Sequence, residues 1–332
     1  MQKETQPIRD IFKKRVNIKP YEYPEMMAFK DAIRFSYWLH TEYNFEADVQ
    51  DFKVNITDME RTAITKVFMA ISQIEVNVKR FWGNIYNIFP KPEIDDIGGT
   101  FAESEVRHKD AYSHLLEILG MNDMFENVGE IPVIADRYKY LEKIMNQESD
   151  TPDEAAVKVI LFAELIEGIS LFGLFYIMMS YYKRLGLFSG INNVVSATSL
   201  EEEVHRLFGV YLFRIIKEEH PYIKNSQFIE DTLKTIIDKA LLAEDKILDW
   251  IFEDGDLPHV SKEEVRNFVL GRFNIALEQM ELDNRFETDT KLDNDNLWFY
   301  EVIKLPADID FFKTVPTDYT KGSKSFTKDD LF

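Results

Sequence analysis

Apolar residues recur at intervals of three and four positions through most of the chain, on faces broad enough to be buried. Polar cap residues and Pro or Gly breaks divide this pattern into long segments, and no alternating strand pattern competes with it. The sequence therefore predicts an all-α fold, a large helix bundle. The expected helices cover residues 26–41, 58–87, 100–119, 131–146, 152–184, 191–219, 225–253 and 261–282.

Four predicted helices open with the spacing of a capping box, in which Ser or Thr stands three residues before Glu. The pairs are Thr57 and Glu60, Thr100 and Glu103, Thr151 and Glu154, and Ser261 and Glu264. Pro152 adds a proline at the first helical position of its segment.

The composition changes after about Leu282, where Asp, Asn, Thr, Lys and Pro become frequent. We expect an N-terminal extension at 1–25, a helical domain at 26–285 and a C-terminal segment at 286–332, most of which cannot bury itself. The end of this segment is either a frayed terminus or a tail that orders on a partner, with Leu331 and Phe332 as apolar anchors.

One stretch, 160–182, is apolar almost throughout and long enough to span a bilayer. Glu164 and Glu167 in its middle would be costly in lipid, and no second span accompanies it. We therefore expect a buried helix of a soluble protein. The chain start has no apolar core of the signal-peptide type, so we expect a cytoplasmic location.

The charge balance is strongly acidic, with 39 basic against 59 acidic side chains and a net charge of −20. This balance argues against binding to nucleic acid or to anionic membranes. The chain has no Cys, which excludes disulfides, thiolate metal sites, iron–sulfur clusters and thiol nucleophiles.

Two of the six histidines stand three residues after a glutamate, in Glu105-x-x-His108 and Glu202-x-x-His205. At this spacing both side chains leave the same helix face about one turn apart, so each pair can reach one metal ion. A single such pair is usually a surface pair. Two copies on separate long helices indicate a metal site.

Dimetal carboxylate proteins complete this pattern with one carboxylate from each of two further helices. Glu75 lies among apolar residues of the predicted helix at 58–87. Glu167 lies in a similar setting at 152–184, and Glu164, one turn earlier, is its rival. The predicted ligands are Glu75, Glu105, His108, Glu167, Glu202 and His205.

Four carboxylates and two imidazoles form an oxygen-rich donor set that suits Fe or Mn. Carboxylates can also bridge two ions, so the set indicates redox chemistry with oxygen species rather than zinc-dependent hydrolysis. The other histidines, at 40, 114, 220 and 259, lack this context, and we expect structural or surface roles for them.

The segment Glu105-Val-Arg-His108-Lys-Asp-Ala-Tyr112-Ser-His-Leu-Leu-Glu117 resembles the metal-and-tyrosine helix of the small, radical-generating subunit of class I ribonucleotide reductases. The order of the ligands along the chain agrees as well, and the likeness covers about residues 30 to 285 and the tail. It implies a ferritin-like helix bundle with a dimetal-carboxylate site in its core, and a homodimer.

The resemblance also assigns roles to residues that do not bind metal. Tyr112 takes the position of the oxidisable tyrosine, and Trp38 that of the tryptophan that relays an electron and a proton toward the partner subunit. Glu201 stands where the family has an Asp that links this tryptophan to a metal-bound His. Tyr319 matches the relay tyrosine of the tail, although Tyr300 is nearby.

The family reduces ribonucleotides through a thiyl radical and a dithiol, and a chain without Cys can supply neither. The resemblance therefore implies that this chain generates an oxidising equivalent and passes it to a cysteine of a large catalytic subunit. The C-terminal residues Asp329-Asp-Leu-Phe332 look like the docking tail for that partner.

Two departures from the family pattern bear on where the oxidising equivalent is held. Many members have Asp as the first ligand, whereas this chain has Glu75. In this it resembles subgroups that keep the oxidising equivalent on a manganese-containing cluster. The pocket of the tyrosine keeps the apolar Leu171 and Phe175 but has Thr198 in place of an aliphatic residue. Either Tyr112 or the metal cluster carries the oxidising equivalent.

The combination of Glu75 and Tyr112 looks most like the dimanganese subgroup called class Id. The expected cofactor is two metal ions per chain, with Mn favoured over Fe or a mixed Mn/Fe pair. Two other readings remain. One is a ferritin-like oxidase or hydroxylase with a small substrate of its own; the other is an iron-storage or scaffold protein.

Overall fold

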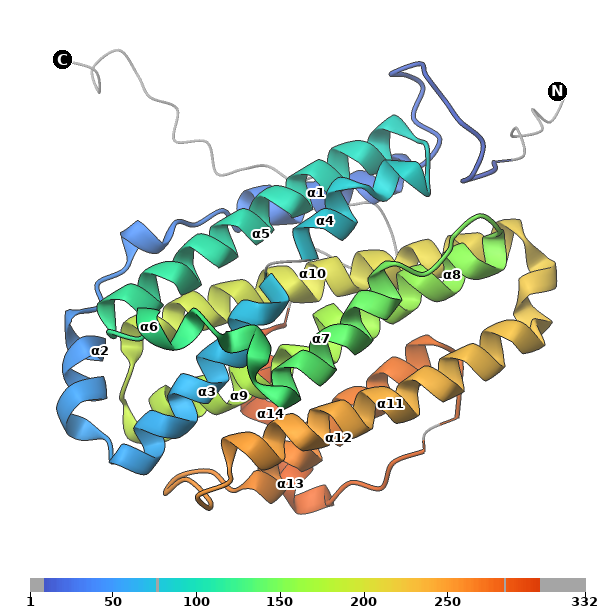
Figure 1. Ribbon diagram of the computed structural model, residues 1–332. Helices are drawn as coiled ribbons and strands as arrows, with labels where there is room; N and C mark the ends of the chain where they lie inside the picture. The colour runs from blue at the N-terminus through green and yellow to red at the C-terminus, as the bar shows by residue number, and fades with distance from the viewer. Residues whose placement is uncertain (1–8, 76–77, 284, 305–332) are drawn as a thin grey trace, which may run out of the picture.

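The computed structural model describes residues 9–75, 78–283 and 285–304, and over these ranges the chain is an all-α bundle without strands (Figure 1). The expected fold class is confirmed. The α-helices are α1 Met27–Phe35, α2 Glu46–Gln50, α3 Asp58–Glu75, α4 Val78–Gly83, α5 Pro92–Ile118, α6 Asn122–Phe125, α7 Pro132–Met145, α8 Pro152–Leu161, α9 Phe172–Leu185, α10 Ser189–Glu219, α11 Gln227–Ile251, α12 Lys262–Gln279, α13 Thr290–Asp295 and α14 Leu297–Val302.

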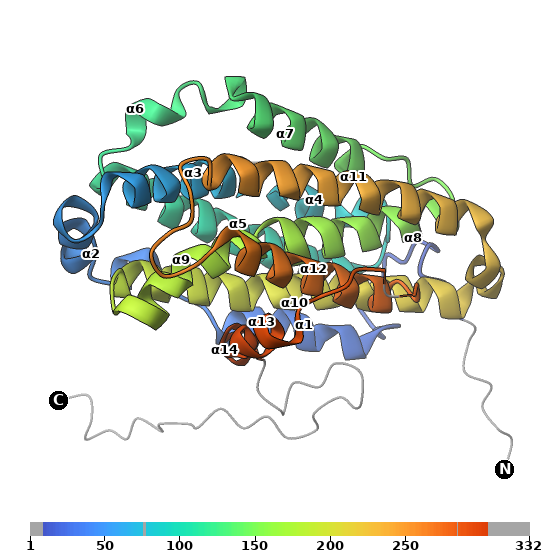
Figure 2. The same ribbon diagram turned by 90° about the horizontal axis from the view of Figure 1, so that it is seen from below.

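Four long helical stretches form the centre of the bundle. They are α3, α5, α10 and the run from α8 to α9. α10 packs against α8 and α9 along their length, and α5 packs against α3 and α10. Outer helices complete the bundle: α1 lies against α5 and α10, and α7, α11 and α12 cover the opposite side (Figures 1 and 2).

The run from Pro152 to Leu185 is long and apolar enough to cross a membrane, but its apolar window is entirely buried inside the protein. It is therefore a core helix, as expected. Its middle third, Phe162–Ser170, is a π-helix, and we call it the π segment. Such wider turns inside an α-helix occur frequently at functional sites.

A glycine allows α10 to approach the π segment closely. A Cβ atom built on Gly209 would lie 2.3 Å from the Cβ of Ala163, which is closer than any real contact. The two helices therefore pack backbone against backbone at this point.

Several predicted helix boundaries were wrong. Residues 26–41 do not form one helix, because α1 ends at Phe35 and Ser36 caps it by donating to the carbonyl of Ala32 at 3.1 Å. The start of α5 is Pro92, eight residues before the predicted one, so Thr100 lies inside the helix and bonds the carbonyl of Asp96.

The other start signals are present. Thr57 and Glu60 form both bonds of a capping box, at 2.8 and 3.2 Å, and Thr151 and Glu154 do the same. Ser261 caps α12 with only one of the two bonds, because the carboxylate of Glu264 turns to Arg184 and Tyr176 instead.

The C-terminal segment contains α13 and α14, which the composition did not predict. Phe299 of α14 is fully buried, and its ring lies 4.9 Å from that of Phe268 and 5.9 Å from that of Phe172. Phe299 therefore anchors α14 to the core, while the rest of the C-terminal segment, from residue 305 on, lies outside the described residues.

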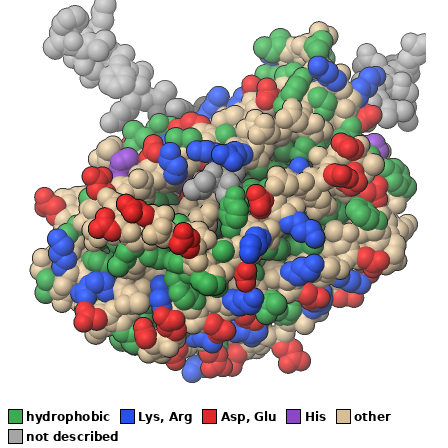
Figure 3. Space-filling view, viewed as in Figure 1, with side chains coloured by type: hydrophobic (Ala, Val, Ile, Leu, Met, Phe, Trp, Pro, Cys, Tyr) green, Lys and Arg blue, Asp and Glu red, His purple; other side chains and the backbone are tan. Residues whose placement is uncertain are grey.

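The surface fits the acidic composition. On the face drawn in Figure 3, Lys and Arg side chains are interspersed with Asp and Glu instead of forming one basic field. This face offers no continuous positive surface that would attract a phosphate backbone.

We predict that Gly209→Ala lowers the free energy of unfolding by about 1–3 kcal/mol, because the new methyl group overpacks the contact with Ala163. Denaturant unfolding followed by circular dichroism measures the change. Gly99→Ala is the control: this glycine is exposed on α5 with no atom within 4 Å of an added Cβ. Removing it from a helix interior is expected to stabilise the protein by ~0.5–1 kcal/mol. Equal effects of the two substitutions would contradict the close approach of the helices.

Candidate dimetal centre

The structure brings all six predicted ligand residues together in the centre of the bundle. Glu75 ends α3, Glu105 and His108 lie on α5, Glu167 lies in the π segment, and Glu202 and His205 lie on α10. All six side chains are at most 1% exposed. They form two groups whose ligand atoms lie within 4.8 Å of one another, and Glu105 and Glu202 belong to both groups.

The two shared glutamates each face both histidines. Oε2 of Glu105 lies 3.5 Å from Nδ1 of His108, and its Oε1 lies 3.0 Å from Nδ1 of His205. The carboxylate of Glu202 makes the same pair of contacts, at 3.0 Å to His108 and 3.3 Å to His205. This is the arrangement that bridging carboxylates need. Glu75 belongs to the half with His108, and Glu167 to the half with His205.

The two rival glutamates, Glu164 and Glu167, both lie in the π segment but have different partners. Glu167 faces His205 at 3.3 Å. Glu164 is also buried, but its carboxylate accepts a hydrogen bond from Arg206 at 2.8 Å instead of facing the centre. The structure therefore places Glu167, and not its rival, among the ligand atoms.

The four buried carboxylates of the centre lack enough positive charge nearby to balance them, and the pKa values of several ligands reflect this. Burial, and then the charge of Glu105, raise the pKa of Glu75 well above its ordinary value. Burial and Glu202 do the same to the pKa of Glu167. Burial alone would lower the pKa of His108 and of His205, but interaction with the surrounding glutamates outweighs burial and raises both pKa values. Glu75, Glu167 and the two histidines are therefore shifted toward their protonated forms, in which protons take the place of other cations.

The residues fit a pair of bound metal ions. Among the described residues, neither carboxylate oxygen of Glu75 or Glu105 has a hydrogen-bond partner, and neither does Nδ1 of His108. Buried oxygens are rarely left in this state unless something else binds them. Two cations would satisfy these atoms and displace the protons, and the hard oxygen donors suit Fe or Mn.

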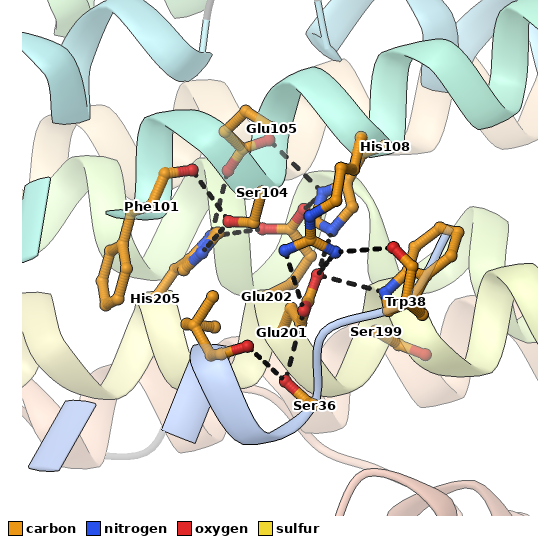
Figure 4. A network of polar contacts seen from close by, with 12 residues as sticks. Ser36, Trp38, Phe101, Ser104, Glu105, His108, Ser199, Glu201, Glu202 and His205 are labelled. Atoms are coloured by element: carbon orange, nitrogen blue, oxygen red, sulfur yellow. Dashed lines mark hydrogen bonds and ion pairs between the residues drawn. The ribbon is translucent and has the colours of Figure 1, made fainter. Parts of the chain in front are cut away.

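Contacts behind the ligands orient both histidines (Figure 4). Nε2 of His108 donates to Glu201 at 2.8 Å. Nε2 of His205 lies 3.0 Å from the hydroxyl of Ser104, which itself donates to the carbonyl of Phe101, so the imidazole is the donor. With Nε2 held as the donor, each ring would present the lone pair of Nδ1 to a bound metal ion once the extra proton has left.

Three residues that contact the ligands or Glu201 were not found from the sequence, namely Ser104, Arg107 and Trp82. Ser104 and Arg107 flank ligands on α5, but no spacing shows which side chain on another helix they meet. Trp82 donates from its indole nitrogen to Glu167 at 2.9 Å, and it lies 85 residues away in the chain. The only available signal was that Ser104 and Arg107 lie beside or inside the first Glu-x-x-His motif.

Trp38 lies next to the centre and is joined to it through Glu201 (Figure 4). Its Nε1 donates to Oε2 of Glu201 at 3.2 Å, and the same oxygen accepts the bond from His108. Arg107 donates to both oxygens of Glu201 at 3.1 Å. Burial opposes ionisation, but His108 and Arg107 hold the pKa of Glu201 below its ordinary value. The carboxylate that Trp38 contacts is therefore ionised.

Tyr112 is buried on α5, one turn beyond His108. Among the described residues its hydroxyl has no hydrogen-bond partner of normal geometry, and neither does the hydroxyl of Thr198. Burial and the charge of Glu75 raise the pKa of Tyr112, while interaction with Thr198 lowers it by a smaller amount. The phenol is therefore protonated at neutral pH.

Other predicted residues lie away from the centre or outside the described residues. Tyr319 and the tail residues 329–332 lie beyond residue 304, where the description ends. The remaining histidines are not ligands of the centre. His40 and His114 contact each other with ring centroids 5.1 Å apart, and His259 lies against Tyr181.

The helix bundle and its buried carboxylate–histidine cluster define a dimetal-carboxylate protein of ferritin-like fold. The chain belongs to the family of the ribonucleotide reductase small chain, whose family model matches residues 15–295.

Viral proteins are among its relatives. The chain is 24% identical over 324 residues to the probable ribonucleoside-diphosphate reductase small subunit of Invertebrate iridescent virus 3, covering 93% of this chain and 85% of the relative. It is 25% identical over 363 residues to that of Invertebrate iridescent virus 6, covering 95% of this chain and 98% of the relative.

Solved structures share the fold. The ribonucleotide reductase R2 subunit from Clostridium botulinum matches with a TM-score of 0.76 at 16% identity, over 86% of this chain and 89% of that one. An R2-like ligand-binding oxidase with a Mn/Fe cofactor matches with a TM-score of 0.67 at 20% identity, over 80% of this chain and 95% of that one.

We predict that Glu202→Ala abolishes loading of both metal ions, because this carboxylate faces both histidines. Metal analysis after incubation with Mn(II) or Fe(II) and desalting measures the loss. Glu218→Ala, an exposed substitution on the same helix, should keep the wild-type metal content. Two ions retained in Glu202→Ala, or no metal bound by the wild-type protein, would show that this cluster is not a dimetal centre.

Proposed function

We propose that the protein is the oxidant-generating subunit of a ribonucleotide reductase, and that it passes an oxidising equivalent from the buried centre to a cysteine of a large catalytic subunit. Membership of the small-chain family supports this role and implies a large-subunit partner. The observation that carries the proposal is the hydrogen-bonded connection from His108 through Glu201 to Trp38.

The six ligand residues would hold two metal ions, with Glu105 and Glu202 shared between them. When bound, the metals supply one-electron oxidising power after reaction with an oxygen species. The protein excludes water from this chemistry, since all six ligand side chains are buried.

Glu201 accepts the proton of Trp38 and returns it. An oxidised indole is a much stronger acid than indole itself, so the Nε1 proton of Trp38 moves to Oε2 of Glu201, 3.2 Å away, when Trp38 loses an electron. The proton returns when the partner subunit supplies an electron to Trp38. Arg107 holds both oxygens of Glu201 and keeps the acceptor in place throughout.

The absence of Cys makes the partner necessary, because this chain offers no thiol to oxidise or to reduce a substrate. We place the contact with the large subunit at the C-terminal tail, with Tyr319 as a relay residue and Leu331 and Phe332 as anchors. We also propose a homodimer in the cytoplasm. The family and the pattern of the tail sequence support these assignments.

We propose manganese as the favoured metal, with Fe or a mixed Mn/Fe pair as alternatives. The support is the combination of Glu75 as first ligand with Tyr112, which resembles the dimanganese subgroup called class Id. Tyr112 and the metal centre are both candidates for holding the oxidising equivalent. The high pKa of Tyr112 makes loss of its proton difficult, and its hydroxyl lacks an acceptor of normal geometry among the described residues.

We predict that Trp38→Phe keeps the metal content of the wild-type protein but loses turnover with the large subunit, because phenylalanine has no N–H for Glu201. Ribonucleotide reduction by the reconstituted complex and metal analysis measure the two properties. Trp250→Phe, on the remote helix α11, is the control and should turn over normally. Normal turnover of Trp38→Phe would show that the relay assignment is wrong.

We predict an exchange-coupled Mn signal without a tyrosyl signal in electron paramagnetic resonance spectra of protein loaded with Mn and activated with superoxide or oxygen. Tyr112→Phe should then leave the spectrum and the turnover unchanged. A sharp organic radical that Tyr112→Phe removes would assign the oxidising equivalent to the tyrosine instead, and protein loaded with Fe provides the comparison.

A further inference from the structure

A second buried charge cluster joins the π segment to α10 and α12. Arg206 of α10 donates to Glu164 at 2.8 Å and to both oxygens of Glu203, at 2.9 and 2.6 Å. Arg272 of α12 donates to Glu203 at 3.3 Å. Both arginine side chains are at most 4% exposed, so the cluster is built into the core.

The arginines of this cluster bond the backbone of the π segment as well as the side chain of Glu164. Nε of Arg272 donates to the carbonyl of Gly168 at 2.8 Å, and Gly168 follows the ligand Glu167 directly. Farther along, Arg137 of α7 donates to the carbonyl of Ser170, while Glu244 accepts from the Ser170 hydroxyl at 2.8 Å. Two arginines from outside therefore bond carbonyls at the end of the π segment.

The absence of a side chain at Gly168 leaves room for Arg206 of the cluster. A Cβ on Gly168 would lie 2.6 Å from Cδ of Arg206. Arg206 cannot easily move away, because Glu164 and Glu203 hold its guanidinium from two sides. The backbone of the π segment and the stem of Arg206 thus occupy adjoining space that only glycine leaves free.

A π-helix needs such support. Its hydrogen bonds run from residue i to i+5, and where it returns to α-helical spacing the buried carbonyls change or lose their helical partner. An arginine that bonds a carbonyl at this point stabilises the wide turn against the α-helical register. The register decides the direction of Glu167, because one residue of shift on a helix rotates a side chain by about 100°.

The cluster does not act as a counter-charge for the metal ligands. It contains two glutamates and two arginines, so its charges balance internally. It is bonded to the helix that carries Glu167, and two of its members, Glu203 and Arg206, directly follow Glu202 and His205 on α10. Its connection to the centre is therefore mechanical.

We propose that Arg272 and Arg206 are positioning residues, which hold the π-helical register of residues 162–170 and so keep Glu167 aimed at the half of the centre that contains His205. This inference rests on the proposed function, since it assumes that the centre binds two ions. Substituting such outer residues typically lowers metal affinity ~10–100-fold.

The first test is Mn(II) titration of the metal-free protein, followed by electron paramagnetic resonance. In Arg272→Gln we expect one of the two ions to bind ~10–100-fold more weakly, with the other at wild-type affinity. The coupled signal of the ion pair should give way to that of a single Mn(II). Arg266→Gln, which removes another arginine of α12 that pairs with Asp245 at the surface, should behave as wild type.

The second test needs no metal. Amide hydrogen exchange in the metal-free protein should become faster over residues 162–170 in Arg272→Gln, but not in Arg266→Gln. If Arg272→Gln does not fold, Arg272→Lys replaces it. Lysine keeps the charge but not the planar fork, so we expect a smaller weakening in the same half of the centre.

Wild-type exchange over residues 162–170 together with wild-type affinity for both ions in these variants would overturn the inference and leave the proposed function standing. Equal weakening of both ions would also overturn it, because that result indicates general destabilisation. If the wild-type protein binds no metal, the proposed function fails, and the exchange measurement alone decides whether Arg272 holds the register.

Discussion

Four carboxylates and two imidazoles sit together in the dry centre of this bundle, and the surrounding structure depends on how their charge is balanced. Ionised carboxylates are strongly destabilised when they leave water unless cations or hydrogen bonds compensate them. Here the protein supplies few of either at Glu75 and Glu105, and the pKa of Glu75 is raised accordingly. The four central helices therefore enclose a space whose most favourable occupants are metal ions.

The ligands could be predicted because they obey a local rule. Residues three apart on a helix share a face, so the pairs Glu105 and His108, and Glu202 and His205, were visible without knowing how the helices pack. The lone ligands Glu75 and Glu167 were found as charged residues inside apolar stretches. The helices themselves followed from apolar periodicity, and two capping boxes placed the starts of α3 and α8 correctly.

The remaining features depend on contacts between distant parts of the chain. Which carboxylate Arg107 meets, or that Trp82 bonds Glu167, depends on how helices rotate against each other, and no local spacing records this rotation. The π segment has the composition of an ordinary apolar helix, so its register could not be predicted. The misplaced start of α5 has a local cause, since Thr100 and Glu103 have the spacing of a capping box but lie within the helix, where Thr100 bonds the carbonyl of Asp96.

Three consecutive residues of α10 face three different environments. Glu201 bonds Trp38, Glu202 faces both histidines of the centre, and Glu203 holds Arg206 and Arg272. All three are the same amino acid, so their roles come only from the angle at which each leaves the helix. A single inserted or deleted residue earlier in α10 would exchange these environments without altering the local composition. The length of α10 before Glu201 is therefore as much a part of this centre as the ligands themselves.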